Sequence, residues 1–355
     1  MQDDLGTLLG LLEHYSPTGQ EARAVDWLLD RMQALGFEVE KDEAGNAIGT
    51  LGAGPRQVLL LGHIDTVPGE IAVRIVDDPQ QGPLLFGRGA ADAKAPLACF
   101  VDGVARLGPR AGWQFVVIGA VDEEGDSRGA RALLDRYRPD YLIVGEPNRW
   151  NRIALAYKGS AWAELSLSTE NRHTAHNQST PAEQAFELWS RLRAYAEAFN
   201  AGRVRLFDQL LLTLRTVNTQ EEAFRLSVQL KLGARLPPDL PPQAWYAELD
   251  KLAAPFEVQP LGYPVPAWQC EKNTPLVRAF LRAIRQVGGE AAFVQKSGTS
   301  DLNIVAPHWR CPALVYGPGD SALDHTPHEH IALEEYRRGV AVLTAALDVL
   351  TDENL

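Results

Sequence analysis

Three short apolar segments of this sequence, each suited to a buried strand, end in side chains that can bind a metal ion. Those side chains are His63 and Asp65 after the first segment, Glu123 and Glu124 after the second, and Glu146 after the third. Open α/β sheets bind their ligands at the carboxyl ends of the strands. Zinc binds histidine nitrogens and carboxylate oxygens where cysteine thiolates are absent. The pattern therefore indicates a metal site at one edge of a sheet.

Two further motifs supply the remaining ligands of such a site. A glycine-rich turn over residues 86–91 leads to Asp92, directly before a helix whose first turn accommodates Pro96. His325 lies in a second polar motif, between the last expected strand and the last expected helix. Hydrolytic sites with two metals share a carboxylate between ions roughly 3.5 to 4 Å apart. The glycines form no GxGxxG at the start of a helix, so we reject a dinucleotide-binding site.

Each motif taken alone has a simpler structural explanation. His63 can be a hydrogen-bonded loop histidine, and Asp65 can be a turn former. An acidic run such as residues 122–126 usually faces water. The position of the motifs after buried strands, and their combination in one chain, favours the metal site.

Composition excludes several classes of function. With 355 residues the chain is long enough for two domains, and its net charge of -12 argues against a nucleic-acid partner. No apolar run reaches the length that spans a membrane. The acidic first residues lack the basic region of a signal peptide, and the three cysteines form no CxxC motif. We therefore expect a cytoplasmic protein with reduced thiols.

Apolar periodicity predicts the elements that must position these residues, and their order indicates an α/β fold. Helices are expected over residues 3–14, 21–35, 181–198, 275–287 and 334–350, and buried strands over residues 58–61, 113–121, 141–144 and 313–316. Residues 157–263 follow the order βαββαβ, the pattern of a ferredoxin-like α+β insertion. We expect this inserted domain to interrupt a discontinuous catalytic domain formed by residues 1–156 and 264–355.

Five motifs follow one another along the chain. They are His63-x-Asp65, Gly87-Arg88-Gly89-x-x-Asp92, Glu123-Glu124, Gly145-Glu146-Pro147 and His325-Thr326-Pro327-x-Glu329. In this order they resemble the dinuclear zinc family that includes acetylornithine deacetylase, succinyl-diaminopimelate desuccinylase and carboxypeptidase G. The resemblance covers nearly the whole chain. It implies a zinc-peptidase-like α/β catalytic domain with an inserted lid and dimerisation domain, and hydrolysis of a linear amide C–N bond.

The resemblance also implies the ligands of two zinc ions in each subunit. His63 and Glu146 would bind one ion, Glu124 and His325 would bind the other, and Asp92 would bridge them. Cobalt is expected to substitute for zinc. His328 and His330 also lie near the motif, and we interpret them as rim residues.

Three further expectations follow from the same family. Asp65 would accept the second ring N–H of His63 and so fix its tautomer. Glu123 would be the general base that takes a proton from the attacking water and returns it to the departing amine. The peptide bond between Asp92 and Ala93 would be cis.

The inserted domain resembles the lid and dimerisation domain of the family, so we expect a homodimer. His176 matches the lid histidine that reaches the partner's site and stabilises the oxyanion, although His173 lies close to it. Hinges are expected near Tyr157 and Gly262, where the chain enters and leaves this domain.

A second set of residues would bind the substrate. Arg235 matches the position where relatives hold the substrate carboxylate with a bidentate fork. Asn218, Gly298, Thr299 and Asp301 are further candidates. We assign to Asp301 the distal ammonium group of the substrate.

The residues after Asp92 depart from the commoner pattern of the family. Residues 93–97 read Ala-Lys-Ala-Pro-Leu, which resembles the branch that hydrolyses lysine or ornithine from a small acidic amino-group carrier protein. This branch serves lysine biosynthesis through aminoadipate or arginine biosynthesis. Acetylornithine deacetylase, a related N-acyl-amino-acid deacylase or a dipeptidase is the alternative. A non-catalytic metal-binding paralogue is the alternative from another class, although all expected ligands are present.

An acidic carrier would need a local basic surface on this acidic chain. Arg149, Arg152 and Lys158 follow Glu146 closely and could form such a rim. A solvated structural role is the alternative for each of them.

Overall fold

The computed structural model describes residues 3–171 and 178–352 and contains two compact units. Unit 1 comprises Met1–Ala156, Gln269–Gln295 and Ser300–Leu355, and unit 2 comprises Tyr157–Trp268 and Lys296–Thr299. The sequence predicts a return to the first domain after residue 263. Strand β12 (Glu257–Val265) runs through that position, so unit 2 extends to Trp268.

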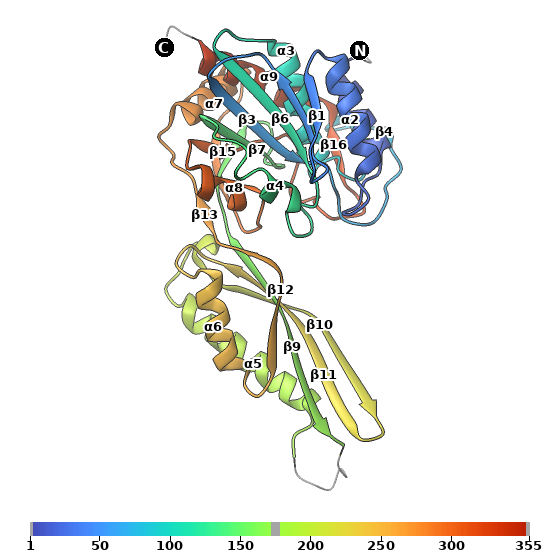
Figure 1. Cartoon of the computed structure of the whole chain (residues 1–355), viewed down its shortest axis with the longest axis vertical. Helices are drawn as coiled ribbons and strands as arrows, with labels where there is room; N and C mark the ends of the chain where they lie inside the picture. The colour runs from blue at the N-terminus through green and yellow to red at the C-terminus, as the bar shows by residue number, and fades with distance from the viewer. Residues whose placement is uncertain (1–2, 172–177, 353–355) are drawn as a thin grey trace. The chain divides into compact units, whose positions relative to one another are not determined.

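Unit 1 contains a nine-stranded sheet in the order β1-β2-β6-β3-β7-β15-β8-β13, with β14 paired to β8 (Figure 1). Its strands are β1 (Glu38–Lys41), β2 (Ala47–Leu51), β3 (Arg56–His63), β6 (Trp113–Ala120), β7 (Tyr141–Gly145), β8 (Arg152–Tyr157), β13 (Trp268–Gln269), β14 (Ala292–Lys296) and β15 (Ala313–Val315). The central strands β6, β3, β7 and β15 are parallel. They are buried on both faces, which explains why their sequences are continuous apolar runs.

Helices cover this sheet (Figure 1). They are η1 (Asp3–Leu5), α1 (Gly6–Glu13), α2 (Ala22–Ala34), α3 (Lys94–Leu107), α4 (Arg128–Ala132), α7 (Pro275–Gln286), α8 (Leu302–Trp309) and α9 (Leu333–Thr351). Two glycines bring α3 close to the strands. A Cβ atom at Gly62 would lie 3.2 Å from Leu97 of α3, and one at Gly119 would lie 3.3 Å from the same side chain. This close packing fixes the start of α3 beside the end of β3.

A small second sheet of unit 1 is absent from the sequence prediction. It consists of β4 (Arg74–Asp78), β5 (Gly82–Phe86) and β16 (His330–Ala332) in the order β16-β5-β4. Exposed β4 carries no buried apolar face, so its pattern resembles a polar loop. The pairing of β16 with β5 brings the chain after Phe86 next to the chain before His330.

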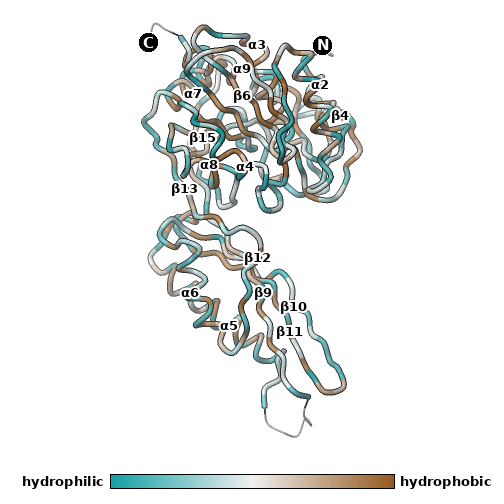
Figure 2. Tube along the Cα trace, viewed as in Figure 1, coloured by the Kyte–Doolittle hydropathy of each residue, from teal (hydrophilic) through white to brown (hydrophobic). Residues whose placement is uncertain are grey.

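Unit 2 has the predicted order βαββαβ. Its elements are β9 (Gly159–Glu170), α5 (Pro181–Asn200), η2 (Leu206–Asp208), β10 (Leu211–Glu222), β11 (Arg225–Leu236), α6 (Pro242–Ala253) and β12. The antiparallel sheet has the order β10-β11-β9-β12, and apolar residues of both helices pack against it. The traces of both helices carry hydrophobic as well as hydrophilic residues (Figure 2). Thr180 and Glu183 form a capping box that begins α5.

Lys158 corrects one sequence interpretation. We assigned it to a basic rim for a carrier protein, but its side chain is fully buried in unit 2. Its ammonium group donates to the carbonyl oxygens of Phe207 at 3.0 Å, Leu206 at 3.3 Å and Gln209. Burial lowers the pKa of Lys158 to about 8. An ammonium group enclosed by carbonyl oxygens cannot dock a partner.

Within residues 3–171 and 178–352, none of the helices combines the length and the apolar character needed to cross a membrane.

The core of unit 2 provides a first prediction. Leu188 of α5 is fully buried, so Leu188→Ala is expected to destabilise unit 2 by about 2 to 5 kcal/mol. Hydrogen exchange should quicken in β9 to β12 and stay unchanged in β3 and β6. Leu206 is 54% exposed in the same unit, and Leu206→Ala is the matched control, expected to change stability by less than about 0.5 kcal/mol. Equal effects of the two variants would contradict the packing described here.

Candidate metal centre

Three neighbouring parallel strands bring the predicted side chains to one edge of the sheet. His63 is the last residue of β3, Glu146 directly follows β7, and Glu123 and Glu124 follow β6 within four residues. Because β3 lies between β6 and β7, the three groups meet at the carboxyl ends of these strands. The site lies entirely within unit 1.

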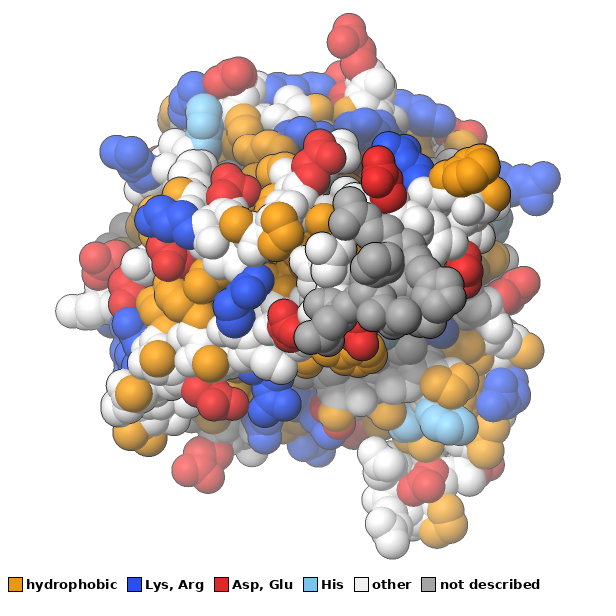
Figure 3. All heavy atoms as spheres, turned by 90° about the horizontal axis from the view of Figure 1, so that it is seen from below, with side chains coloured by type: hydrophobic (Ala, Val, Ile, Leu, Met, Phe, Trp, Pro, Cys, Tyr) orange, Lys and Arg blue, Asp and Glu red, His pale blue; other side chains and the backbone are white. Residues whose placement is uncertain are grey.

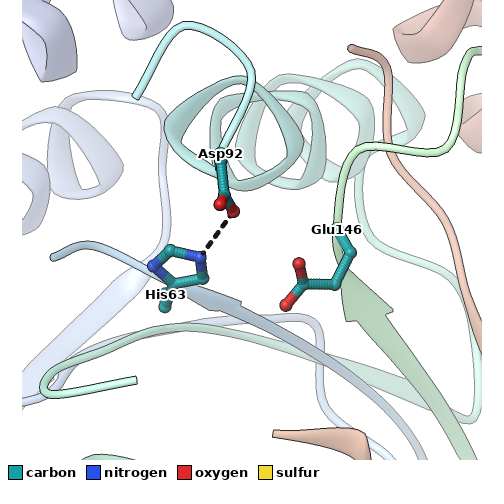
Figure 4. A group of neighbouring side chains, drawn as sticks. All are labelled: His63, Asp92 and Glu146. Carbon is teal, nitrogen blue, oxygen red and sulfur yellow. Dashed lines mark hydrogen bonds and ion pairs between the residues drawn. The ribbon is translucent and has the colours of Figure 1, made fainter. Parts of the chain in front are cut away.

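The first potential ligand group consists of His63, Asp92 and Glu146 (Figure 4). Their ligand atoms lie within 4.8 Å of one another, and the three side chains converge from β3, the start of α3 and the end of β7. His63 Nε2 lies 3.3 Å from Asp92 Oδ1. His63 and Glu146 are buried, which shields this group from solvent.

The second potential ligand group consists of Asp92, Glu124 and His325. His325 Nε2 lies 3.0 Å from Glu124 Oε1 and 3.1 Å from Asp92 Oδ2. Asp92 thus directs one oxygen to each histidine, which is the arrangement that a carboxylate shared by two metals requires. His328 and His330 belong to neither group of the described residues, and the His330 ring packs on Phe86.

Burial and neighbouring charges shift the pKa values of the acids and histidines in this cluster. Burial raises the pKa of Glu146 and Glu123 well above the usual range, and nearby acids add to the effect. Burial also disfavours the Asp92 anion, but hydrogen bonds with His325 and His63 outweigh it and lower the pKa of Asp92. The carboxylates of Asp92 and Glu124 raise the pKa of His325 to about 10. The buried carboxylates and histidines offer oxygen and nitrogen atoms as metal ligands, and such ligands suit zinc or a similar divalent metal.

Glu123 differs from the neighbouring acids because it belongs to neither ligand group of the described residues. Its backbone N–H donates to Asp65, whereas no hydrogen bond of its carboxylate to another described side chain is found. Asp122 before it and Ser127 after it have left-handed backbones, with φ of 68° and 51°. Such conformations are uncommon for these residues and cluster at functional sites.

Asp65 has contacts beyond the one that the sequence predicts. His63 Nδ1 lies 2.9 Å from the Asp65 backbone oxygen and 3.5 Å from the Asp65 carboxylate. That carboxylate also accepts the backbone N–H groups of Glu123 at 3.0 Å and Glu124 at 3.1 Å. The short loop after His63 turns the Asp65 carbonyl back to the ring. Asp65 therefore faces the His63 ring with both its backbone oxygen and its carboxylate, and the carboxylate also positions the two glutamates.

Thr18 is a supporting residue that the sequence interpretation missed. Its hydroxyl donates to Asp65 Oδ2 at 2.8 Å. The sequence predicts a helix break at residues 16–19, and backbone contacts with Thr66, among them the bridge to Pro17, bring this segment to the site. No local pattern signals such a contact. By contrast, the peptide bond between Asp92 and Ala93 is cis, which confirms the sequence prediction.

The predicted substrate residues divide between the two units. In unit 2, Arg235 donates through Nη1 to Thr299 Oγ1, beside Gly298, and Asn218 is exposed on β10. Asp301 is in unit 1, where it is buried before α8 and burial raises its pKa to about 7. His176 and His173 lie outside the described residues.

The shared carboxylate gives a second prediction. Asp92→Ala is expected to abolish tight binding of both metal ions, because Asp92 belongs to both groups. His325→Ala should abolish tight binding of only one metal ion. His328→Ala is the matched control and should still bind two metal ions tightly. Metal titration of the metal-stripped protein, with elemental analysis, measures this. Retention of one tightly bound ion by Asp92→Ala would exclude the shared arrangement.

Comparisons with known proteins identify the family of this chain. Residues 59–349 match peptidase family M20/M25/M40. The chain is 40% identical to a [LysW]-lysine hydrolase of Deinococcus radiodurans, with 94% of this chain and 92% of that protein covered. It is 28% identical to a [LysW]-lysine/[LysW]-ornithine hydrolase of Sulfurisphaera tokodaii, with 92% and 90% covered.

A solved structure matches the fold over the same length. It is an M20 family metallo-carboxypeptidase of Sulfolobus solfataricus, with a TM-score of 0.78 and 16% identity over 99% of this chain and 100% of that one. The mixed α/β architecture is therefore shared with this group of structures. The chain belongs to peptidase family M20/M25/M40 and is a metal-dependent hydrolase of amide bonds.

Proposed function

We propose that this enzyme releases lysine, ornithine or both from an amide link to the glutamate side chain of a small acidic amino-group carrier protein. The reaction would serve lysine or arginine biosynthesis. Similarity over nearly the whole chain to relatives named for LysW-linked lysine and ornithine supports this substrate. The observation that carries the chemistry is the Asp92 carboxylate, which directs one oxygen to each of two histidines.

We further propose that the bound metals are two zinc ions in each subunit, with cobalt as a functional substitute. His63 and Glu146 would hold one ion, Glu124 and His325 the other, and Asp92 both. When bound, such a pair supplies Lewis acidity that lowers the pKa of a water molecule and polarises an amide carbonyl. The potential ligands are nitrogen and oxygen atoms, which fits this assignment.

Glu123 would transfer the proton in this reaction. Its carboxylate would accept a proton from the attacking water and deliver it to the amine that leaves as the C–N bond breaks. Burial raises the pKa of Glu123 well above its usual range. Asp65 holds the backbone of Glu123 and thereby limits where its side chain can reach.

Substrate contacts are assigned by chemistry. Arg235 would hold the free α-carboxylate of lysine, with Thr299, Gly298 and Asn218 as further contacts. Thr299 accepts a hydrogen bond from Arg235, which restricts the guanidinium group. Asp301 would accept the distal ammonium group, for which a carboxylate is the suitable partner.

Of the three residues expected to form a basic rim for the carrier, Arg152 is the remaining candidate, because Lys158 is buried and Arg149 is paired with acids. Arg149 pairs with Asp320 and with Glu335, the latter at 3.2 Å, so acids already neutralise its charge. Arg152 is exposed at the start of β8. On the face in Figure 3, basic and acidic side chains are interspersed, so this face offers no uniform basic surface to an acidic carrier.

A homodimer formed through unit 2 is part of the proposal, with His176 acting in the partner's site. Strand β10 is an edge strand of twelve residues without proline, whereas the opposite edge strand β12 contains Pro260 and Pro264. Proline cannot donate to a neighbouring strand, so β10 is the edge open to pairing. The apolar side chains of Phe186 and Val217 in unit 2 are 70% and 44% exposed, and a dimer contact would cover such side chains.

The cytoplasmic location of the protein stays a prediction.

The third prediction concerns the reaction. The zinc-loaded enzyme should release lysine from carrier-linked lysine with a higher kcat/KM than it shows for acetylornithine. Glu123→Gln should keep two metals but lose about 100-fold to 10,000-fold in kcat, because it removes only the proton carrier. Asp126→Asn, in the same acidic loop, is the matched control and should retain activity. Amine release with parallel metal analysis measures both effects.

Two outcomes would reject parts of this proposal. Efficient hydrolysis of acetylornithine or a dipeptide, with no release from carrier-linked lysine or ornithine, would support a deacylase or dipeptidase. An active Glu123→Gln enzyme with bound metal would show that another group transfers the proton.

The fourth prediction tests the dimer. An inactive Glu123→Gln protein mixed with an inactive His176→Ala protein should recover partial activity after subunit exchange. Recovery is expected because one site of each mixed dimer would combine intact Glu123 with intact His176 from the other subunit. Fluorescence energy transfer between labelled subunits verifies the exchange. Complete exchange without recovered activity would exclude a site shared between subunits.

A further inference from the structure

A buried glutamate lies behind the shared carboxylate. Glu329 is fully buried, and it lies four residues after His325 and directly before β16. Because β16 pairs with β5, Glu329 faces the segment that leads from Phe86 to Asp92. Glu329 thus belongs to one ligand-bearing segment and contacts another that is more than two hundred residues away in the sequence.

The carboxylate of Glu329 accepts hydrogen bonds from three donors of that second segment. Oε1 accepts the backbone N–H groups of Ala91 and Asp92, each at 2.9 Å. Oε2 accepts Nη1 of Arg88 at 2.8 Å. The Nε of Arg88 donates to the carbonyl oxygen of Gly69 at 2.8 Å, which holds the guanidinium group in place.

These contacts require an ionised carboxylate. Arg88, Ala91 and Asp92 all donate to the Glu329 side chain, and an ionised carboxylate accepts hydrogen bonds without donating any. An amide would direct its own N–H groups at Arg88 or at the backbone N–H groups. Burying a carboxylate is costly unless its lone pairs are used, and here charge-assisted hydrogen bonds offset that cost.

We propose that Glu329 is a positioning residue for the metal pair, an inference that rests on the proposed two-metal function. It fixes the backbone of Ala91 and Asp92, so that the Asp92 carboxylate presents one oxygen to the group of His63 and the other to the group of His325. Glu329 itself belongs to neither potential ligand group of the described residues. It also ties the chain that carries His325 to the same point, which sets the distance between the two groups.

This role differs from general stabilisation because it acts on the orientation of one ligand. With an amide in place of the carboxylate, either the guanidinium group of Arg88 or the N–H groups of Ala91 and Asp92 would face another donor, and the turn before α3 could rotate. All five potential ligands would still be present. The expected defect is weaker binding at the shared position, since residues that orient a ligand typically contribute about 10-fold to 100-fold in metal affinity.

The fifth prediction is tested by titrating cobalt(II) chloride into the metal-stripped full-length protein. Glu329→Gln should bind the second cobalt ion about 10-fold to 100-fold more weakly and show an altered visible absorption spectrum. Glu335→Gln is the matched control. The Glu335 carboxylate also accepts a hydrogen bond from an arginine, Arg149, and one from a backbone N–H, that of Gly319. The control should match the wild type in affinity and spectrum.

A second variant separates positioning from the ion pair. Arg88→Lys keeps a cation beside Glu329 and leaves the Ala91 and Asp92 contacts intact, so its cobalt affinity should stay closer to wild type than that of Glu329→Gln. Circular dichroism and thermal unfolding of the metal-stripped variants show whether each is folded.

Each result has one meaning. A folded Glu329→Gln protein that binds two cobalt ions with wild-type affinity and spectrum would overturn the positioning role. Equal losses of affinity in Glu329→Gln and Glu335→Gln would also overturn it, because the effect would then be general destabilisation. If the wild type itself binds fewer than two cobalt ions, the proposed two-metal function fails instead.

Discussion

Mutual repulsion among buried carboxylates is the constraint on which this structure depends. Glu123, Glu124 and Glu146 lie at the ends of adjacent strands, and burial raises the pKa of each because a charged acid is poorly solvated there. Such groups stay together in their ionised form only when cations balance them. The histidines supply part of that charge, and two divalent metals would supply more. The fold must therefore hold repelling side chains in place before a metal binds.

Two carboxylates outside the ligand groups help to hold the repelling side chains in place, and both do so through backbone N–H groups. Asp65 accepts the consecutive backbone N–H groups of Glu123 and Glu124, and Glu329 accepts those of Ala91 and Asp92. Each therefore fixes a turn instead of a single side chain. Positioning through the backbone leaves the ligand side chains free to meet the metals. The sheet sets the approximate positions, and these hydrogen bonds set the orientation.

Much of this arrangement is predictable because parallel buried strands are apolar runs that end at one edge. The positions of His63, Glu124 and Glu146 follow from that rule. Contacts between distant segments do not follow from it. Thr18 reaches Asp65 through a loop, and Lys158 is enclosed by carbonyls that lie about fifty residues later in the sequence. Exposed β4 was missed because neither of its faces is buried.

The most direct test of the account is a crystal structure of the metal-loaded enzyme, with anomalous scattering used to locate the ions. The account predicts two ions roughly 3.5 to 4 Å apart, one on each side of the Asp92 carboxylate. Glu123 should bind neither ion and should lie within hydrogen-bond reach of a water between them. A single ion, or two ions with Asp92 bound to only one of them, would contradict the shared carboxylate.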